Sequence, residues 1–372
     1  MKTIEIHVIH TVPPQAANRD DLGRPKSLTY GGVERARWSS QSQKRALRSL
    51  FRELELIPAE ERAVRTRALR QALKQALGWE EAELVEALQG LLAALGLKEE
   101  KGLMEYLLFL GNSEVAALAG ILEAHREALR EHLQARAAEE EEGKKGKAKR
   151  KAQAGELPAE LMKALKGAFQ ANLEVALFGR MIADRKDLEV EGALAVGHAV
   201  GVTADPIEDD YFTAMDDLLN QAGMLESRGF AAPTLYRYAS LNLGRLAEQV
   251  GRERALLGAR AVLQGFPFAI PGGGQRSFAH LGEPEAVLLR VGEGLPRNLA
   301  KAFARPVEGP EHPAEAALKR LMGYWARLDA LYGPLQKEGK SGVSLFPVEG
   351  FPWAASYREA VERALKSAEG LL

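Results

Sequence analysis

A block of almost purely helical pattern divides this chain and limits the folds that it can adopt. Residues 58–136 repeat apolar side chains at helical spacing, with helix-starting signals such as Pro58-Ala59-Glu60 and helix-ending glycines. The segments before and after the block mix the periods of strands and helices. We therefore predict a helical domain, spanning 58–156, that is inserted into a fold built from both strands and helices.

A charged run closes the inserted block. Glu139 to Lys151 holds four consecutive Glu followed by Gly, Lys and Arg, and Ala is its only hydrophobic residue type. Such a composition buries too little apolar surface to offset the entropy lost when a chain becomes ordered. We expect 137–155 to be a mobile surface linker. Its basic half can reach nucleic acid, although charge runs usually stay solvated.

The N-terminal part combines a strand with an amphipathic helix. Ile4, Ile6 and Val8 alternate with Glu5, His7 and Ile9, which predicts a strand with one face in the core. Further along, Ser40 and Gln43 form a capping-box pattern in front of a helix over 44–54. The apolar stripe expected on this helix consists of Leu47, Leu50, Phe51 and Leu54.

The part after residue 157 returns to mixed structure. A helix to Phe169 and a strand over Leu173–Phe178 are expected first. Residues 203–233, rich in Asp, Gly and Pro, separate two strand-like arms and predict a protruding hairpin. Helices are predicted at Arg252–Leu263, Ala314–Leu331 and Ser356–Ala368, and a strand at Ala286–Val291. This order indicates an α+β sandwich of the ferredoxin-like kind, interrupted by insertions.

Composition removes several classes of site. The chain has no cysteine, so it forms no disulfide or thiolate metal site, and its seven histidines lack zinc-ligand spacing. We expect no metal and no cofactor. Neither a leader-like N-terminus nor an apolar run of membrane length is visible, so we expect a cytoplasmic protein with no membrane partner.

Basic charge gathers around the N-terminal helix although the whole chain carries a net charge of -1. Between Arg19 and Arg52, nine basic residues face three acidic ones. The nine are Arg19, Arg24, Lys26, Arg35, Arg37, Lys44, Arg45, Arg48 and Arg52. Cations near a helix N-terminus are unfavourable unless an anion lies there, and free amides at that end suit a phosphate. A cradle for an RNA backbone and a solvated helix face with an ordinary serine cap explain this pattern about equally well.

A glycine-rich loop is a second candidate site. Pro271-Gly272-Gly273-Gly274 precedes Gln275 and Arg276, so backbone amides can approach a phosphate or a base edge. The loop lacks the lysine and the Ser/Thr of a P-loop, and it lacks the spacing of dinucleotide-binding loops. A flexible connector is the competing interpretation.

Acidic and aromatic pairs give weaker signals. Asp20-Asp21, Asp209-Asp210 and Asp216-Asp217 can hold metal ions for phosphodiester hydrolysis only if carboxylates converge, and adjacent residues rarely do so. Tyr211-Phe212 is an aromatic pair in a polar excursion without a local core. Its rings either fold back or stack against bases.

Several segments, taken together and in order, resemble the major backbone subunit of the type I-E CRISPR surveillance complex Cascade, the CasC-type family. These segments are Asn18-Arg19-Asp20-Asp21, Gly31-Gly32, Arg37 with 39–42 and 44–46, Gly179-Arg180-Met181, Phe212-Thr213-Ala214 with Asp216-Asp217, 236–239 with Asn242-Leu243, and Pro271-Gly272 with Gln275-Arg276. They extend over nearly the whole chain.

The resemblance implies an RRM-like palm, a helical finger domain and a β-hairpin thumb. On this division the palm consists of 1–57, 157–197 and 234–372, the finger of 58–156, and the thumb of 198–233. The family implies contacts with guide RNA from three kinds of position. These are the palm helix and the loop before it (Arg19, Ser39, Gln41, Lys44, Arg45, Arg48), a pair at the end of an expected strand (Arg180, Met181), and the thumb and glycine loop (Tyr211, Phe212, Thr213, Gln275, Arg276). Arg24 and Lys26, which belong to the basic cluster, are predicted to contact the RNA as well.

The resemblance also implies a function in antiviral defence of prokaryotes. Copies of such a subunit stack along one CRISPR RNA into a helical ribonucleoprotein and display the guide for pairing with target DNA. The implied partners are guide RNA, further copies of the chain, the guide-end cap, the hairpin-processing endonuclease, and the large and small subunits. We expect no enzymatic activity. The alternative is a metal-dependent endoribonuclease that uses aspartates of the thumb.

Overall fold

The computed structural model describes residues 1–372 other than 80, 96, 130, 132–158, 183–184 and 220. The chain forms two units, each described by itself: a sheet unit of Met1–Ile57 and Ala193–Leu372, and a helical unit of Pro58–Gly192. The linker predicted at 137–155 lies outside the described residues.

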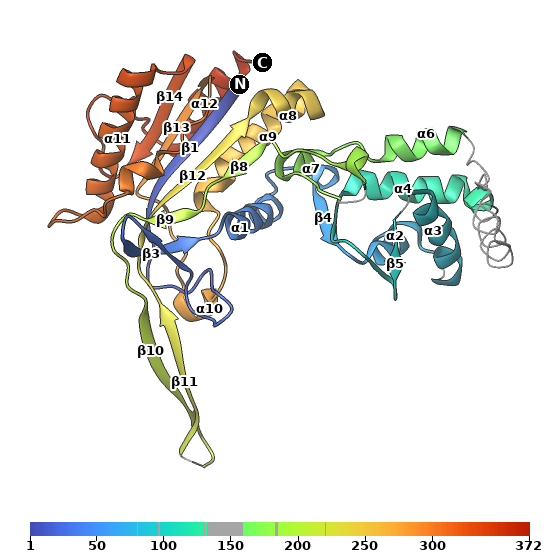
Figure 1. Ribbon diagram of the computed structural model, residues 1–372, viewed down its shortest axis with the longest axis horizontal. Helices are drawn as coiled ribbons and strands as arrows, with labels where there is room; N and C mark the ends of the chain where they lie inside the picture. Colours follow the sequence, from blue (N-terminus) through green and yellow to red (C-terminus); the bar gives the residue numbers. More distant parts are fainter. Residues whose placement is uncertain (80, 96, 130, 132–158, 183–184, 220) are drawn as a thin grey trace, which may run out of the picture. The chain divides into compact units, whose positions relative to one another are not determined.

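An antiparallel sheet of eight strands, whose neighbours are mostly not consecutive in sequence, is the centre of the sheet unit (Figure 1). Its strand order is β14-β13-β1-β12-β9-β3-β2, and β8 pairs with β12 beside this path. The strands are β1 (Lys2–Thr11), β2 (Ser27–Tyr30), β3 (Val33–Trp38), β8 (Leu194–Val196), β9 (Ala199–Gly201), β12 (Thr234–Asn242), β13 (Ala286–Glu293) and β14 (Gln336–Ser344). The central strand β1 therefore pairs with two strands from the second half of the chain.

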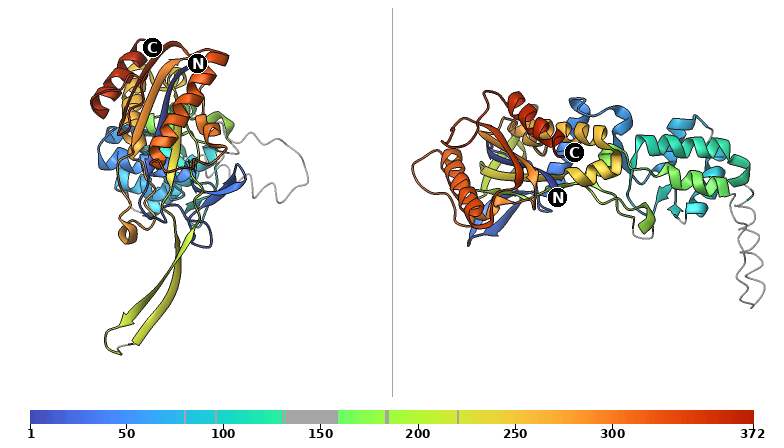
Figure 2. Two further views of the ribbon diagram at one scale, coloured as in Figure 1. Left: turned by 90° about the vertical axis from the view of Figure 1, so that its left-hand side faces the viewer. Right: turned by 90° about the horizontal axis from the view of Figure 1, so that it is seen from above.

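Helices cover both faces of this sheet (Figure 2). On one side lie α1 (Ser40–Glu53), α8 (Leu243–Val250), α9 (Arg252–Gly265) and α12 (Tyr357–Glu369), and on the other lies α11 (Pro313–Tyr332). The prediction that the first strand turns only one face to the core is wrong. Glu5, His7 and Ile9 are buried as completely as Ile4 and Ile6, because α11 covers their side.

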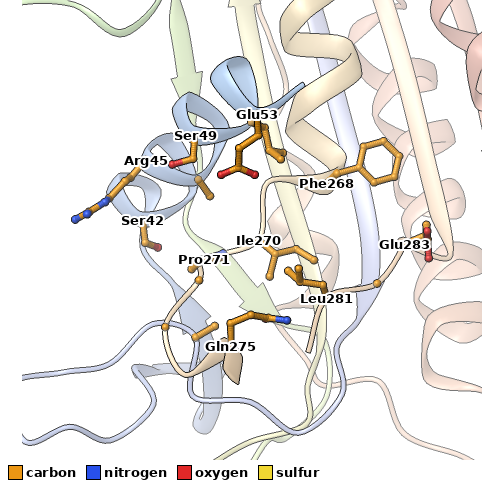
Figure 3. A pocket seen from close by; sticks show the side chains of 16 residues that line it. Ser42, Arg45, Ser49, Glu53, Phe268, Ile270, Pro271, Gln275, Leu281 and Glu283 are labelled. Atoms are coloured by element: carbon orange, nitrogen blue, oxygen red, sulfur yellow. The ribbon is translucent and has the colours of Figure 1, made fainter. Parts of the chain in front are cut away.

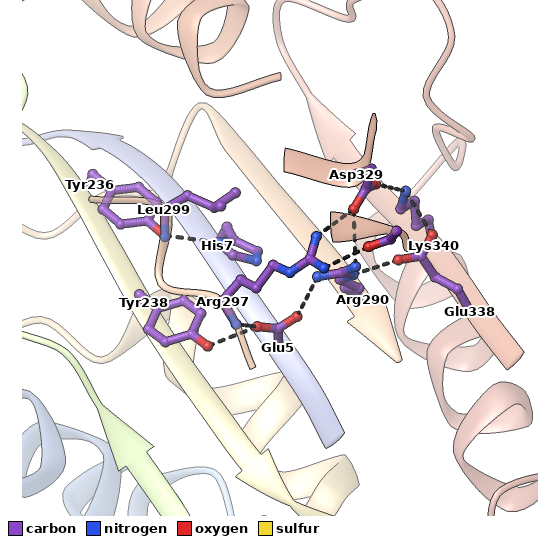
Figure 4. Close-up of polar contacts among 11 residues, drawn as sticks. Glu5, His7, Tyr236, Tyr238, Arg290, Arg297, Leu299, Asp329, Glu338 and Lys340 are labelled. Atoms are coloured by element: carbon purple, nitrogen blue, oxygen red, sulfur yellow. Dashed lines mark hydrogen bonds and ion pairs between the residues drawn. The ribbon is translucent and has the colours of Figure 1, made fainter. Parts of the chain in front are cut away.

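A network of polar side chains joins α11 to the sheet (Figure 4). The guanidinium of Arg290 contacts Glu5 at 3.2 Å and Asp329 of α11 at 3.3 Å, and Glu5 also accepts a hydrogen bond from Tyr238 at 2.9 Å. Burial raises the pKa of Glu5, and burial together with the charge of Arg290 lowers the pKa of His7 to about 3. Paired charges in an interior need such partners, so this network fixes how α11 lies on the sheet.

A long antiparallel hairpin extends from the sheet unit (Figure 1). It consists of β10 (Glu208–Asp216) and β11 (Gln221–Phe230), with a register shift between Ala214 and Met215. The hairpin expected within 203–233 is confirmed.

The helical unit has a core of its own, made mainly of leucines from its helices. The helices are α2 (Leu69–Leu77), α3 (Glu81–Leu95), α4 (Asn112–Ala124), α6 (Ala159–Ala168) and α7 (Leu173–Phe178). Four short strands, β4 (Ala63–Thr66), β5 (Glu99–Glu100), β6 (Leu103–Met104) and β7 (Leu108–Gly111), accompany them, so the prediction of an almost entirely helical block is wrong there.

Two further expectations differ from the structure. Leu173–Phe178 was expected as a strand and is the helix α7, because Asn172 caps it by accepting a hydrogen bond from the Val175 amide at 3.0 Å. The helical unit also continues to Gly192 and not to 156, since Leu161 and Leu165 of α6 complete its core. Among the described helices, none is long and apolar enough to cross a membrane.

Candidate nucleic-acid interface

The N-terminus of α1 is held by side chains from three segments. The Ser39 hydroxyl accepts a hydrogen bond from the Ser42 amide at 3.2 Å, and the Asn18 side chain accepts one from the Ser39 amide at 2.7 Å. His198 Nδ1 lies 3.3 Å from the Ser40 amide and accepts its hydrogen bond. The cap is thus Ser39, and the capping box expected one residue later is wrong.

Gln43 has a different function from the predicted cap. Its buried amide donates to the Gly197 carbonyl at 3.0 Å and accepts from Arg237 Nε at 3.2 Å. Arg237, completely buried on β12, also donates to the carbonyl oxygens of Phe266, Pro267 and Ala269 at 2.6–2.8 Å. One arginine therefore holds both α1 and the segment that leads into the glycine loop.

Further cations gather where α1 begins. Burial lowers the pKa of His198, and the charges of Arg37 and Lys26 lower it further, which places both side chains within electrostatic reach of the imidazole. Lys26 precedes β2 and is partly buried, and its backbone bonds to Asn18 and Arg37. Because His198 binds the Ser40 amide, these cations act close to the N-terminus of α1, where a helix favours anions.

One face of α1 lines a cavity of about 840 Å³ (Figure 3). Ser42, Arg45, Ser49 and Glu53, spaced at helical intervals, form this wall, with the cation near the start of the helix and the carboxylate near its end. The opposite wall is formed by 270–273, Gln275 and 281–283. The helix and the glycine loop, which are more than 210 residues apart in sequence, therefore face the same space.

The glycine loop reaches this position by a close backbone approach. The Gly273 amide donates to the Ala17 carbonyl at 3.2 Å, and a Cβ added at Gly273 would overlap that carbonyl oxygen. At Gly272 a Cβ would meet open space. Gly273 therefore has no room for a side chain, whereas Gly272 does. Beyond them, the short helix α10 (Gln275–Phe278) begins, whereas the predicted loop extends to Arg276.

The other predicted residues of this region differ in exposure. Arg19, Arg24, Gln41, Arg45 and Arg276 are exposed, whereas Lys44, Arg48 and Gln275 are partly buried. Arg24 forms an exposed ion pair with Asp209 at 3.3 Å. Leu54, expected in the apolar stripe of α1, is more than half exposed and follows the end of the helix, so that part of the stripe is wrong.

The predicted aromatic residues of the hairpin lie on opposite faces. Tyr211 is paired with Ser227 and Thr213 with Leu225, while Phe212 between them is paired with Glu226. Because side chains alternate along a strand, Tyr211 and Thr213 share one face and Phe212 occupies the other. Tyr211 is 64% exposed and Phe212 is partly buried, so the rings cannot contact the same base face together.

The remaining predicted pair lies in the helical unit. Arg180 is buried and its Nη1 binds both oxygens of Glu114 at 2.7 and 2.8 Å, so its guanidinium is not available to a phosphate in this structure. Burial raises the pKa of Glu114 while Arg180 opposes that rise. Met181 is 81% exposed and lines a cavity of about 390 Å³ with Arg65 and Phe109.

The acidic pairs of the hairpin have partners of their own. Asp209 faces Arg24, Asp210 is paired with Arg228 across the strands, and Asp216 accepts hydrogen bonds from the amides of Leu218 and Leu219. In the part of the chain that the structure describes, no three His, Asp or Glu side chains form a metal-ligand group.

Sequence patterns did not identify four residues that build this interface: Asn18 as a cap partner, His198, Gln43 as a buried linker, and Arg237. His198 lies 158 residues from the amide that it binds, so no local pattern connects them. Arg237 had a signal, because it is the one charged residue in a strand that is otherwise uncharged and largely apolar, and a buried arginine requires acceptors.

Comparison with known proteins agrees with the fold. A chain of a solved structure described as "CRISPR RNA-guided surveillance complex, pre-nicking" is 29% identical, with a TM-score of 0.82 over 98% of this chain and 100% of that chain. A chain of a "CRISPR RNA-guided surveillance complex" is 27% identical, with a TM-score of 0.70 over 98% of this chain and 99% of that one. A search of curated proteins found no match.

A family model described as "CT1975-like protein" matches residues 4–349. This match extends from within β1 to beyond β14, and it includes the cavity, the hairpin and the helical unit. The chain therefore belongs to the CT1975-like protein family.

Proposed function

We propose that this chain is a guide-RNA-binding, non-catalytic backbone subunit of a CRISPR surveillance complex of type I-E, Cascade. The observation that carries the proposal is the cavity between α1 and the glycine loop, where Arg45, two serines and Gln275 line one space beside the cationic end of α1. The similarity of the whole chain to chains of RNA-guided surveillance complexes supports RNA as the ligand.

The RNA is held through its backbone and not read by its sequence. In an ordinary RRM, exposed aromatic residues of the sheet stack on bases. Here that mode is not open to the central strand, because Glu5, His7 and Ile9 are buried on the side of α11 and Ile4 and Ile6 on the other. The cations near the start of α1 and the polar side chains that line the cavity remain, and groups of these kinds contact phosphates. Base pairing of the guide with target DNA then supplies the specificity, as in other RNA-guided effectors.

In this proposal the sheet unit is an RRM-like palm, the helical unit a finger domain and the β10–β11 hairpin a thumb. Phe212, projecting from one face of the hairpin, lies against a displaced base, and neighbouring copies continue the RNA path. The partners are CRISPR guide RNA, further copies of the chain, the guide-end cap, the hairpin-processing endonuclease, the large and small subunits and, through the guide, target DNA. The complex acts in the cytoplasm of a prokaryote.

Purification with the guide and the partner subunits at low ionic strength tests the proposal. We expect RNA of uniform length in the particles and a helical repeat in electron micrographs. Particles free of nucleic acid would overturn the proposal. Incubation of the assembled particles with complementary RNA and magnesium tests the non-catalytic part, because regularly spaced cuts would show an endoribonuclease.

A further inference from the structure

A buried arginine holds the chain where it leaves the sheet toward the hairpin. Arg35 of β3 is fully buried, and its Nη1 donates to the carbonyl oxygens of Gly201 at 3.0 Å and Thr203 at 3.1 Å. Its Nη2 donates to the Phe303 carbonyl at 3.3 Å. The planar guanidinium thus ties the link between β9 and β10 to two other parts of the sheet unit.

Asp205 also holds the link between β9 and β10, through the two oxygens of its carboxylate. One carboxylate oxygen accepts from the Ala36 amide at 3.3 Å, and the other accepts from the Thr203 hydroxyl at 2.6 Å. The carboxylate lies so close to Gly201 that a Cβ at that position would overlap it. Residues 201–205 are therefore held both by the Arg35 guanidinium and by the Asp205 carboxylate.

The returning arm of the hairpin is fixed by its backbone. Ala231 and Gln15 exchange two hydrogen bonds at 2.9 and 3.0 Å, and the Val12 amide donates to the Pro233 carbonyl at 2.9 Å. Farther along the hairpin, the pair formed by Arg24 and Asp209 is about half exposed, and exposed pairs contribute little. The returning strand β11 also contacts α10, where Arg228 donates to Ser277 at 3.3 Å and lies 5.1 Å from the Phe278 ring. The buried hydrogen bonds at the root of the hairpin are those of Arg35 and Asp205, whereas the ion pair and the Arg228 hydrogen bond farther along it are exposed.

We propose that Arg35 and Asp205 are positioning residues that set the direction in which the hairpin leaves the sheet. This inference rests on the proposed function, because the direction decides where along a bound RNA strand Phe212 meets a base. A lysine cannot replace the arginine, since its single ammonium cannot bind three carbonyl oxygens in the fixed geometry of a guanidinium. The Arg35→Lys variant therefore keeps the positive charge but no longer fixes the direction in which the hairpin leaves the sheet.

The absence of cysteine makes a direct measurement possible. Spin labels on Ser227→Cys in β11 and Arg358→Cys in α12, both exposed, report the distance between hairpin and sheet unit by pulsed electron paramagnetic resonance in the full chain without RNA. We expect Arg35→Lys to widen or shift the distance distribution. Asp209→Asn, which removes the exposed pair with Arg24, is the matched control and should leave the distribution as it is.

An unchanged distribution in Arg35→Lys, recorded well below its unfolding temperature, would overturn the proposal and leave Arg35 a purely stabilising residue. If Arg35→Lys does not fold, the isosteric Asp205→Asn decides the question in the same way. Fluorescent base analogues then separate this inference from the proposed function. With RNA bound, the variant should alter the base signal while affinity stays within the range of the control. If RNA does not bind to the unsubstituted protein, the proposed function fails, whereas the distance measurement still tests the anchor.

Discussion

The Nε of Arg237 donates to the side-chain oxygen of Gln43 at 3.2 Å, so a buried strand of the sheet holds the helix that lines the cavity. The same guanidinium binds three carbonyl oxygens of 266–269, and burial lowers its pKa to about 9. Positions on both walls of the cavity thus depend on one interior cation.

Arg237→Met should release this arrangement. Four buried acceptors would lose a charged donor, and each such hydrogen bond contributes about 1.5–3 kcal/mol, so we expect the free energy of unfolding to fall by at least about 3 kcal/mol. Hydrogen exchange measured by mass spectrometry should accelerate in 266–271 and in α1. The exposed Arg358→Met in α12 is the control, and equal exchange in both variants would contradict the assignment.

Charge reversal on α1 tests the RNA contact. Lys44→Glu combined with Arg48→Glu should weaken RNA binding and lower the slope of log affinity against log salt by about 0.7 for each phosphate that the variant no longer neutralises. Binding is measured by fluorescence anisotropy over a series of salt concentrations. The control is Arg358→Glu, which reverses a charge in the same sheet unit at a position that does not line the cavity. If affinity and slope are unchanged in the double variant, the face of α1 that carries Lys44 and Arg48 does not hold the RNA.

The glycine loop provides a matched pair of substitutions. Gly273→Ala places a methyl group on the Ala17 carbonyl, and we expect a loss of stability of about 1–3 kcal/mol together with weaker RNA binding. Gly272→Ala meets open space and should behave like the unsubstituted chain. Urea unfolding and RNA titration measure the two effects, and equal behaviour of the two variants would show that the approach to Ala17 is not needed.

Phe212→Ala should leave folding intact, because the hairpin has no core around this ring. We expect a change in the free energy of unfolding within about 0.5 kcal/mol and a changed signal from base analogues in bound RNA. Met215→Ala, an exposed apolar residue of the same strand, is the control. A large fall in the unfolding temperature would instead assign Phe212 to the core.

Two buried histidines, His7 and His10, should make the free energy of unfolding depend on pH. Burial, together with the charges of Arg290 and Arg237, lowers the pKa values of His7 and His10 to about 3. In the unfolded chain both titrate near 6.5, so below about pH 6.5 the unfolded state takes up protons that the folded state refuses. Each histidine should then cost up to about 1.4 kcal/mol per pH unit between roughly 6.5 and 3.

The raised pKa of Glu5 acts in the opposite direction, because its folded form takes up a proton first as the pH falls. Urea unfolding at several pH values between about 7 and 5 measures the combined effect of these groups on the free energy of unfolding. The His7→Gln variant should remove the contribution of one proton from the slope of this free energy against pH. An identical slope in His7→Gln would contradict the low pKa of His7.

Local periodicity predicted the parts of the fold that depend on local interactions. The amphipathic pattern of 44–54 indicated α1, and the turn-rich stretch between two strand-like arms indicated the hairpin. The apolar run Leu173–Phe178 was too short to separate strand from helix, and the Asn172 cap decided for the helix.

Distant partners account for what the sequence could not predict. The family resemblance predicts that Arg180 contacts RNA, and no local pattern shows that it binds Glu114, 66 residues away in the helical unit. The burial of Glu5 and His7 depends on α11, more than 300 residues along the chain. Within the site, the composition of α1 and the glycine loop pointed to an anion, whereas their common cavity depends on Arg237.

The pairing of β1 has a consequence for synthesis on the ribosome. His7 contacts Tyr236, 229 residues later, so the first strand emerges long before either neighbour exists. At roughly 5–20 residues per second, it waits on the order of ten seconds or more with its isoleucines exposed to water. The contiguous stretch Pro58–Gly192 is complete well before β12 and β13 appear. The nascent chain must therefore carry an unpaired apolar strand while Pro58–Gly192 folds, and a chaperone that shields this strand would raise the yield of native protein.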